Sequence, residues 1–232
     1  KDVLRRDLTI NALFYDMGRE EVVDLVGGLD DIKNSKIRTV GIAADRFAED
    51  PLRKLRALRF AGRTGSKLEK ETAEAILTDN SLEGISPERI RDEFKKSVTT
   101  AKSAKKYLEM VSEFKLWNIM FPSLPVSEKF IDTNNWLIQL THLFMANDTD
   151  VLKKEMNKAT FSNDEISGVI FLKNLMAFDP ANVFDTHKQF NNSGLDKKVI
   201  LEFVKINRLD AKMIKAFFKY KPSTNGKDVM KE

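Results

Sequence analysis

The sequence predicts an α+β fold that is mostly α-helical, with a few short strands near the start of the chain and helices over the rest. Strand-like patterns end near residue 44. From Asp45 onward, apolar residues recur at the three- and four-residue spacings of amphipathic helices. Two proline residues that follow a helix-capping Asp or Ser mark helix starts in this second part, at Asp50-Pro51 and Ser86-Pro87.

The composition excludes several classes of protein. Of the 232 residues, 42% are hydrophobic and 32% are charged, which is typical of a globular chain. No apolar run reaches the roughly 18 residues of a membrane span, and no signal peptide opens the chain, so we expect no membrane partner. The absence of cysteine excludes disulfides and thiolate metal sites and is typical of the cytoplasm. A net charge of +4 does not by itself indicate nucleic-acid binding.

The expected elements follow from periodicity and from helix and strand breakers. Strands are expected at 8–15, 21–26 and 37–41, and Gly27-Gly28 is expected to form a turn before an acidic helix start at Asp30-Asp31. In the first half, helices are expected from Asp50-Pro51 to Gly62 or Gly65, and over 69–79, 86–99 and 103–114, followed by a short apolar turn at 118–122. In the second half they are expected over 127–146, 148–158, 163–176, 180–190, 196–206 and 209–220.

The second half contains many aromatic and methionine side chains at mixed helical spacings. This pattern predicts the core of a helical bundle rather than a surface for base stacking. With only two histidines, His142 and His187, a histidine metal site or a Ser-His-Asp triad has little support, and we expect both to be structural or exposed. The expected core residues are Trp136, Phe144, Phe161, Phe171, Met176, Phe178, Phe184, Phe203, Phe217 and Phe218.

The helix predicted after Asp50-Pro51 carries a row of charged side chains on one side and a row of leucines on another. Guanidinium groups match phosphate or base edges, and a carboxylate accepts a hydrogen bond from an exocyclic amine. This segment alone leaves two interpretations open, a solvated amphipathic helix and a ligand-binding face. At three-residue steps, the charged row consists of Asp50, Arg53, Arg56 and Arg59, and the apolar row of Leu52, Leu55 and Leu58.

A second group of polar side chains, Asp7, Thr9 and Asn11, interrupts an apolar segment near the N-terminus. On a strand, these three side chains would share one face. Their polar groups need partners, which a ligand or the neighbouring loop could supply, and the pattern does not distinguish the two.

Five motifs in a fixed order resemble those of the class II (bacterial-type) tRNA nucleotidyltransferases, the CCA-adding enzymes, and of the related bacterial poly(A) polymerases. The resemblance covers residues 1 to about 100, and the order makes it far more specific than any single motif. The motifs are Arg5-Arg6-Asp7-Leu8-Thr9-Ile10-Asn11-Ala12-Leu13, Asp24 through Gly27-Gly28 to Asp31-Ile32, Ile37-Arg38-Thr39-Val40-Gly41, Arg46-Phe47-Ala48-Glu49-Asp50-Pro51-Leu52-Arg53 to Arg59-Phe60-Ala61, and Ile85-Ser86-Pro87-Glu88-Arg89-Ile90 through Glu93 to Lys96.

The resemblance implies an enzyme that adds CMP, CMP and AMP, from CTP and ATP, to the 3′ end of tRNA without a nucleic-acid template. It also implies that Asp50 and Arg53 select the base, with the carboxylate accepting from the amine that C and A share. A poly(A) polymerase is the alternative, because it has the same motifs. The implied nucleotide-binding residues are Arg6, Asp7, Asn11, Asp50, Arg53, Arg56 and Arg59, and the implied supporting residues are Glu49, Glu88 and Arg89.

The family's catalytic motif is an Asp-x-Asp pair that follows a glycine turn, precedes the Arg-Arg-Asp motif and holds Mg²⁺. This chain shows no such pair. Asp148-Thr149-Asp150 has the spacing, but we interpret it as a helix start. We therefore expect no catalytic or metal-binding residue in this chain and no activity of the chain alone. Two interpretations stay open: part of an enzyme whose metal-binding head comes from elsewhere, including from a separate chain, and a non-catalytic RNA-binding module.

The resemblance also implies a division of the chain into four parts. These are the C-terminal part of a nucleotidyltransferase head at 1–44, a helical neck with the nucleotide-selecting helix at 45–124, a helical body at 125–221, and the start of a tail at 222–232.

Overall fold

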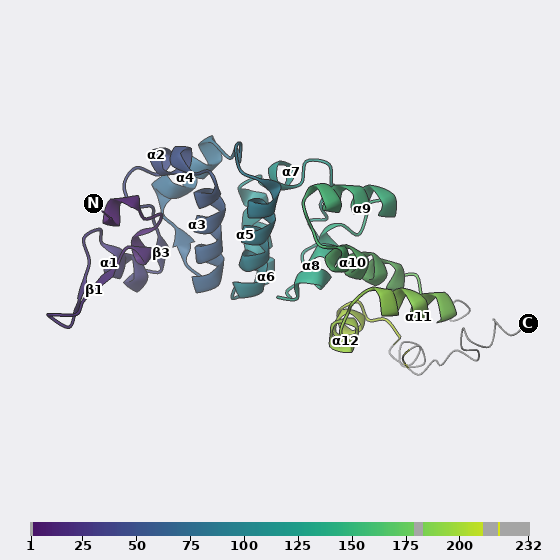
Figure 1. Ribbon diagram of the computed structural model, residues 1–232. Helices are drawn as coiled ribbons and strands as arrows, with labels where there is room; N and C mark the ends of the chain where they lie inside the picture. Colours follow the sequence, from purple (N-terminus) through teal and green to yellow (C-terminus); the bar gives the residue numbers. More distant parts are fainter. Residues whose placement is uncertain (1, 179–182, 211–217, 219–232) are drawn as a thin grey trace, which may run out of the picture. The chain divides into compact units, whose positions relative to one another are not determined.

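A computed structural model describes residues 2–178, 183–210 and 218 (Figure 1). The expected fold class is confirmed, because helices dominate and the strands form only small sheets. The chain divides into two compact units, residues 1–161 and 162–232, and each is described by itself. The division into parts at 44, 124 and 221 stays a prediction. The expected helix over 209–220 lies largely outside the described residues, and the expected tail at 222–232 lies entirely outside them.

The first unit begins with short elements. β1 and β2 form an antiparallel two-stranded sheet in which Tyr15 pairs with Val22, and β3 pairs in parallel with β4. Within the described ranges, no helix of the molecule spans a membrane. The elements are the 3-10 turns η1 (Val3–Arg5) and η2 (Thr9–Asn11), the strands β1 (Phe14–Asp16) and β2 (Glu21–Val23), the helix α1 (Gly28–Lys33), and the strands β3 (Lys36–Ile37) and β4 (Lys67–Leu68).

The expected strand over 8–15 is wrong except at its end, since Thr9–Asn11 is a 3-10 turn and only Phe14–Asp16 is a strand. Polar side chains explain the difference. Thr9 Oγ1 donates to Asp31 Oδ2 at 2.6 Å, and Asn11 Nδ2 donates to Asp7 Oδ1 at 3.3 Å. These bonds hold the two side chains in a turn, and the bond to Asp31 joins residues 22 positions apart in the sequence. The loop and α1, rather than a shared strand face, therefore provide these partners.

The expected turn before an acidic helix start is confirmed at α1. Gly27 has a φ of 81°, in the left-handed region that favours glycine. Gly28 lies so close to η2 that a Cβ atom there would be 2.3 Å from the carbonyl oxygen of Thr9. The Asp24 carboxylate accepts from the amides of Leu29 and Gly27, and these backbone bonds lower its pKa. The turn is therefore shaped by packing and capping and needs no bound phosphate.

The remainder of the first unit is helical. As expected, α3 ends at Gly65, which has a φ of 72°, and Ser86 Oγ caps α5 by accepting from the amide of Arg89. Asp148 caps α9, which confirms its interpretation as a helix start. The helices are α2 (Ala43–Glu49), α3 (Leu52–Thr64), α4 (Lys70–Thr78), α5 (Pro87–Thr100), α6 (Ala104–Glu113), α7 (Trp117–Met120), α8 (Trp136–Leu143) and α9 (Thr149–Lys158).

The expected helix over 127–146 is shorter in the structure, since α8 begins only at Trp136. Side-chain bonds hold the preceding segment in another conformation. Asn134 Nδ2 donates to the carbonyl oxygens of Val98 and Ala101, and Gln139 Nε2 donates to that of Thr133. The bonds of Asn134 join residues distant in sequence, so helical periodicity could not reveal them.

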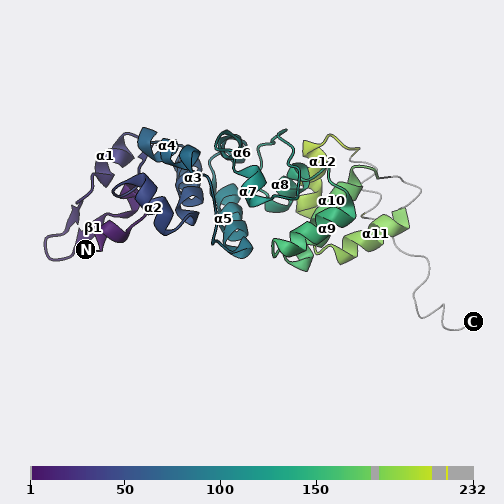
Figure 2. The ribbon, with the colours of Figure 1, turned by 90° about the horizontal axis from the view of Figure 1, so that it is seen from above.

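Helices α3, α5 and α6 pack against one another and form the centre of the first unit (Figures 1 and 2). The predicted leucine row of α3 faces this core, since Leu55 and Leu58 are fully buried. Phe94 of α5 lies at the middle of an aromatic cluster, with ring centroids of Trp117 and Trp136 at 5.7 and 5.5 Å. The predicted assignment of Trp136 to the core is confirmed, and so are those of Phe144 and Phe161.

The second unit contains three described helices. Ser162 and Glu165 form a capping box at the start of α10, and α10 contacts α11. Phe171 and Phe203 are buried as predicted, whereas Met176 is exposed because it follows the end of α10. Phe217 lies outside the described residues. The helices are α10 (Asn163–Leu175), α11 (Val183–Asn192) and α12 (Lys197–Ile206).

One ion pair lies inside the contact between α3 and α5. Arg59 Nε of α3 donates to Glu93 Oε1 of α5, and only 11% and 5% of these side chains are exposed. The Arg59 guanidinium also lies over the Phe60 ring, 4.3 Å from its centroid. Charges withdrawn from water need close partners, so this pair constrains how the two helices fit together.

We predict that Arg59→Ala lowers the free energy of unfolding by about 3–5 kcal/mol, because Glu93 is left charged, buried and unpaired. Arg63→Ala, which removes an exposed arginine of the same helix, is the matched control and should change stability by less than about 0.5 kcal/mol. Urea unfolding followed by circular dichroism measures both. Replacing both Arg59 and Glu93 by Met should lower the free energy of unfolding by less than Arg59→Ala alone, because no unpaired charge is left buried. Equal losses for Arg59→Ala and Arg63→Ala would contradict this role.

Candidate functional site

The charged row of α3 lies where the first forty residues meet the helices. Asp50 lies just before the helix. Its Oδ1 accepts from the amide of Leu52 at 3.2 Å, and its Oδ2 accepts from Arg89 Nη2 of α5 at 3.1 Å. The Asp50 side chain is 31% exposed. Its carboxylate is thus oriented by Arg89 of α5 and still accessible to a ligand, and the supporting role implied for Arg89 stays a prediction.

Arg53, one helical turn after Asp50, connects three segments. Its Nη1 donates to Glu49 Oε2 at 2.7 Å and to the carbonyl oxygen of Arg46 at 3.3 Å, both on α2. Its Nη2 donates to the carbonyl oxygen of Arg5 at 3.5 Å. The side chain is 17% exposed. Glu49 thus orients the guanidinium of Arg53, and the supporting role implied for Glu49 stays a prediction.

Arg56 joins α3 to the N-terminal motif. Its Nε and Nη2 both lie 2.7 Å from Asp7 Oδ2, while Asp7 Oδ1 accepts from Asn11 and from the amide of Leu8. Burial alone would raise the pKa of Asp7. The charge and hydrogen bonds of Arg56, together with the bonds from Asn11 and the Leu8 amide, lower this pKa below its ordinary value. The structure thus brings Asp7, Asn11 and Arg56 together, as one bonded group.

The remaining predicted site residues lie differently. Arg59 points into the helix packing and pairs with Glu93, which favours support of the helix over ligand contact. Arg6 is exposed, bonds to Asp2 at 3.3 Å and lies over the Phe14 ring at 5.7 Å. Glu88 is exposed in the first turn of α5. The structure therefore groups Arg56 of the charged row with Asp7 and Asn11. It directs Arg59 to Glu93, and Arg6 to Asp2.

Sequence reasoning missed two bonded groups around this site. Arg46 Nη1 donates to the carbonyl oxygen of Leu4 at 2.8 Å, and its Nη2 lies 3.0 Å from Glu49. Arg38 Nε donates to Asp31 Oδ2 at 2.9 Å, so Asp31 accepts from both Arg38 and Thr9. The i,i+3 spacing of Arg46 and Glu49 on α2 was a usable signal. No signal in the sequence connected Arg38 with Asp31.

The carboxylates of the site do not fit the implied Mg²⁺. Across the described ranges, no group of three or more His, Cys, Asp or Glu side chains converges on a possible metal position. Asp7 is already paired with Arg56, and Asp50 with Arg89. The roles of these residues therefore do not depend on a bound metal. Of the two histidines, His142 is partly buried in α8, and burial lowers its pKa.

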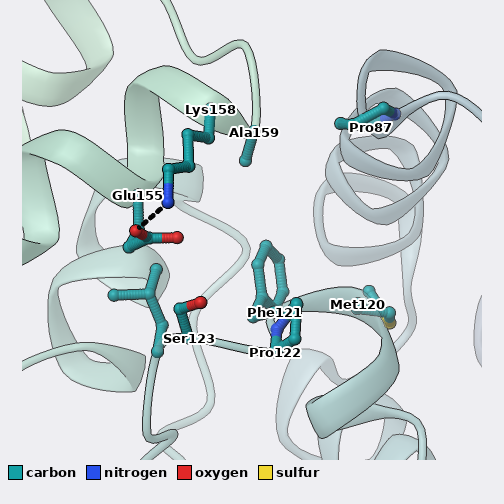
Figure 3. A pocket seen from close by; sticks show the side chains of 9 residues that line it. Pro87, Met120, Phe121, Pro122, Ser123, Glu155, Lys158 and Ala159 are labelled. Carbon is teal, nitrogen blue, oxygen red and sulfur yellow. Dashed lines mark hydrogen bonds and ion pairs between the residues drawn. The ribbon is translucent and has the colours of Figure 1, made fainter.

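A cavity of about 310 Å³ lies elsewhere in the first unit (Figure 3). It is lined by the start of α5, by α7 with the loop after it, and by the end of α9, and not by α3. The buried residues Met120, Phe121 and Leu124 make it largely apolar. Lys158 Nζ donates to Glu155 Oε1 at 2.6 Å, so this lysine is neutralised by a neighbouring acid. The cavity therefore does not have the character of a phosphate site.

The Asp7–Arg56 pair predicts a dependence of stability on pH. Because the folded state lowers the pKa of Asp7 below its ordinary value of 3.8, the pair stabilises the fold above that value. The stabilisation is lost as the pH falls through the folded-state pKa. We predict that Asp7→Asn lowers the free energy of unfolding at about pH 7, and that wild type and variant converge as the pH falls below 3.8 and through the folded-state pKa. A difference that stays constant over this range in urea unfolding would contradict the prediction.

Comparison with protein-family models gives two matches. Residues 1–38 match the poly(A) polymerase head domain, and residues 65–126 match a domain described as the probable RNA and SrmB-binding site of polymerase A. The first match includes the Asp7 and Asn11 part of the site. The second includes α5, with Arg89 and Glu93.

Curated relatives are similar over about half of the chain. The CCA-adding enzyme of Lactobacillus delbrueckii subsp. bulgaricus is 49% identical over 98 residues, which are 41% of this chain and 24% of that protein. That of Bacillus pumilus is 42% identical over 130 residues, which are 56% of this chain and 31% of that protein. Poly(A) polymerase I of Escherichia coli O6:H1 is 38% identical over 125 residues, 53% of this chain and 27% of that protein. The chain thus spans about a quarter to a third of these relatives.

Solved structures extend the similarity over nearly the whole chain. The CCA-adding enzyme of Bacillus stearothermophilus, solved with CTP, has a TM-score of 0.76 and 27% identity over 99% of this chain and 63% of that one. The fold also matches the CCA-adding enzyme of Thermotoga maritima, solved with tRNA, with a TM-score of 0.64 and 19% identity over 100% of this chain and 64% of that one. The family models, the curated relatives and the solved structures thus all relate parts of this chain to CCA-adding enzymes and bacterial poly(A) polymerases.

Proposed function

We propose that this chain is part of a template-independent RNA nucleotidyltransferase that adds CMP, CMP and AMP to the 3′ end of tRNA, and that Asp50 and Arg53 select the base. The observation that carries the proposal is the pairing of an acceptor and a donor at one accessible helix end. Asp50 is oriented by Arg89, and Arg53 by Glu49, so neither depends on the ligand for its position.

The chemistry of the bases supports this assignment. Cytosine and adenine each present an exocyclic amine beside an unprotonated ring nitrogen, whereas uracil and guanine present a carbonyl beside a ring N–H. A carboxylate accepts from the amine and a guanidinium donates to the ring nitrogen, so C and A satisfy both side chains. G and U would leave both unpaired, which strongly disfavours them. The oxygens of Asp50 retain accepting capacity beside the bonds from Leu52 and Arg89.

The other site residues have distinct proposed roles. Arg56 is 35% exposed and so is available to a phosphate, with Asp7 and Asn11 orienting it. Arg6 is exposed and remains a proposed nucleotide contact, and Glu88 a proposed support. Arg59 supports the helix, because it is committed to Glu93 inside the packing. These roles together assign nucleotide contact to the start of α3 and mechanical support to its end.

The proposed partners are CTP, ATP and tRNA. Among the related solved structures, the Bacillus stearothermophilus enzyme is in complex with CTP, another CCA-adding enzyme is in complex with ATP, and the Thermotoga maritima enzyme is in complex with tRNA. The Mg²⁺ of the reaction would be held by carboxylates outside the described residues, on a head that a separate chain could supply. The cytoplasmic location stays a prediction.

The alternative function is poly(A) addition, favoured by the match to poly(A) polymerase I over 53% of the chain. The two activities differ in their use of CTP. A complete enzyme that incorporates AMP repeatedly and CMP never would identify the alternative. A non-catalytic RNA-binding module is the further alternative, and it predicts no incorporation of any nucleotide even with a metal-binding head present.

We predict that Arg53→Ala removes discrimination in a complete enzyme, assembled from this chain and the catalytic head of the Bacillus pumilus relative. The preference for CTP and ATP over UTP and GTP should fall by about ten- to hundredfold, as expected for one lost base contact. The measurement is incorporation of each labelled nucleotide into tRNA lacking its CCA end. Arg63→Ala, on the same helix and exposed, is the control and should keep the wild-type preference. Unchanged discrimination in Arg53→Ala would contradict base selection by this residue.

We also predict that the chain alone transfers no nucleotide. Mixed with Mg²⁺, CTP, ATP and tRNA lacking its CCA end, it should give no incorporation above a reaction without protein. The physical reason is that its described carboxylates do not converge on a metal position. Incorporation by the chain alone would show that the metal site lies within it.

A further inference from the structure

Two arginines hold the first turns of α5 from different directions. Arg89 Nη2 donates to Asp50 Oδ2, just before α3, at 3.1 Å. Arg91 Nη1 donates to the carbonyl oxygen of Thr160, in the turn after α9, and to its Oγ1 at 3.1 Å. Residues two apart on a helix are rotated by about 200° from each other, so the two side chains leave α5 on nearly opposite sides. The start of α5 is therefore tied both to the start of α3 and to the end of α9.

The guanidinium of Arg91 is bonded through three of its nitrogen atoms. Besides the bonds of Nη1, its Nε and Nη2 donate to Asp92 Oδ1 at 3.0 and 2.7 Å, and only 17% of the side chain is exposed. The planar fork of an arginine fixes the directions of these donors, which the ammonium of a lysine cannot reproduce. Asp92 therefore orients Arg91 toward Thr160.

Thr160 has a backbone conformation that is unusual for its residue type. Its φ is 61°, in the left-handed region, where a β-branched residue is an outlier. The amide of Thr160 donates to the carbonyl oxygen of Asn157 at 2.9 Å, and the amide of Phe161 to that of Met156 at 3.0 Å. Strained conformations persist where several contacts hold them. The bonds from Arg91 are among these contacts, so the turn after α9 and the start of α5 constrain each other.

The cavity of about 310 Å³ lies between the same two elements. Figure 3 shows Pro87, the first residue of α5, across this space from Ala159, which directly precedes Thr160. Side chains that line a cavity lose packing contacts on that side. Apolar packing between the start of α5 and the end of α9 is thus incomplete. Arg91, one helical turn after Pro87, joins the two elements beside the cavity.

We propose that Arg91 is a positioning residue for base selection, which ties α5 to Thr160 and so holds Arg89 where it orients Asp50. The proposal rests on the proposed function, and it extends the support of the selecting helix to the turn after α9. Arg91 itself does not contact the nucleotide in this proposal, because its side chain is directed away from Asp50 and is bonded to Asp92 and Thr160.

The physical reason is the order of the Asp50 carboxylate. Without the bonds to Thr160, the first turn of α5 borders the cavity without this polar link, and Arg89 is no longer held at a fixed distance from Asp50. A carboxylate that must be ordered by the ligand binds it less selectively, because part of the binding free energy is used for the ordering.

The experiment uses the complete enzyme described above, assembled from this chain and the catalytic head of the Bacillus pumilus relative. It measures the preference for CTP over UTP with tRNA lacking its CCA end. The variants are Arg91→Ala, Arg89→Ala and the double variant with both changes. Arg63→Ala, the loss of an exposed arginine on α3, is the matched control. Circular dichroism checks that each variant is folded, and Arg91→Lys, which keeps the charge beside Asp92 but not the fork, replaces Arg91→Ala if that variant does not fold.

The expected result is that Arg91→Ala lowers the preference for CTP over UTP by about three- to tenfold, as for one lost hydrogen bond, while Arg63→Ala keeps it. In the Arg89→Ala background, adding Arg91→Ala should change the preference by less than about twofold, because Arg91 acts through Arg89. Arg91→Lys should lie between wild type and Arg91→Ala. An unchanged preference in Arg91→Ala, or an equal effect of Arg91→Ala in both backgrounds, would overturn the proposal.

Hydrogen exchange separates this proposal from the proposed function. In the chain alone, the amides of the first turn of α5 should exchange at least about threefold faster in Arg91→Ala than in wild type or Arg63→Ala, because the turn opens more often. Faster exchange, with a base preference that neither Arg53→Ala nor Arg89→Ala alters, would overturn the proposed function and leave Arg91 as the group that positions α5. A preference that Arg53→Ala lowers and Arg91→Ala does not would overturn the role of Arg91 and leave the proposed function standing.

Discussion

The buried ion pair between Arg59 and Glu93 is the contact on which the arrangement of the first unit depends. Withdrawing two charges from water is tolerated only when they meet in close geometry, so the pair restricts how α3 lies against α5. The same two helices are joined a second time at the start of α3, where Asp50 accepts from Arg89. Between these contacts, Arg56 reaches Asp7 in the N-terminal motif. One helix thus fixes its position against two other parts of the chain, α5 and the N-terminal motif.

This arrangement divides the charged row of α3 by function. Arg59 is enclosed by packing and supports the helix, whereas Asp50 and Arg53 lie at the accessible end and are each oriented by a second charged group. Preorganised donors and acceptors discriminate between ligands better than mobile ones, because no binding energy is used to order them. The buried contacts at one end of α3 therefore make base selection at the other end physically reasonable.

The N-terminal region and the helices have opposite characters. The helices enclose their aromatic side chains, as around Phe94, while the β1–β2 hairpin leaves Tyr15 and Leu25 in contact with solvent. Among the described residues, no carboxylates converge on a metal position, so the base selection proposed for α3 would need metal-binding carboxylates outside them.

The sequence by itself determined the helical class, the leucine row of α3, the caps at Ser86 and Asp148, and the resemblance to CCA-adding enzymes and bacterial poly(A) polymerases. These depend on short-range periodicity and on motif order. The resemblance also implied that Asp50 and Arg53 select the base. Tertiary structure alone decided that residues 9–11 form a turn, that α8 begins only at Trp136, and that Arg59 is buried against Glu93. The physical reason is the same in each case. In each case at least one deciding hydrogen bond or ion pair joins residues far apart in sequence, and a local pattern contains no information about such partners. These are Thr9 with Asp31, Asn134 with Val98, and Arg59 with Glu93.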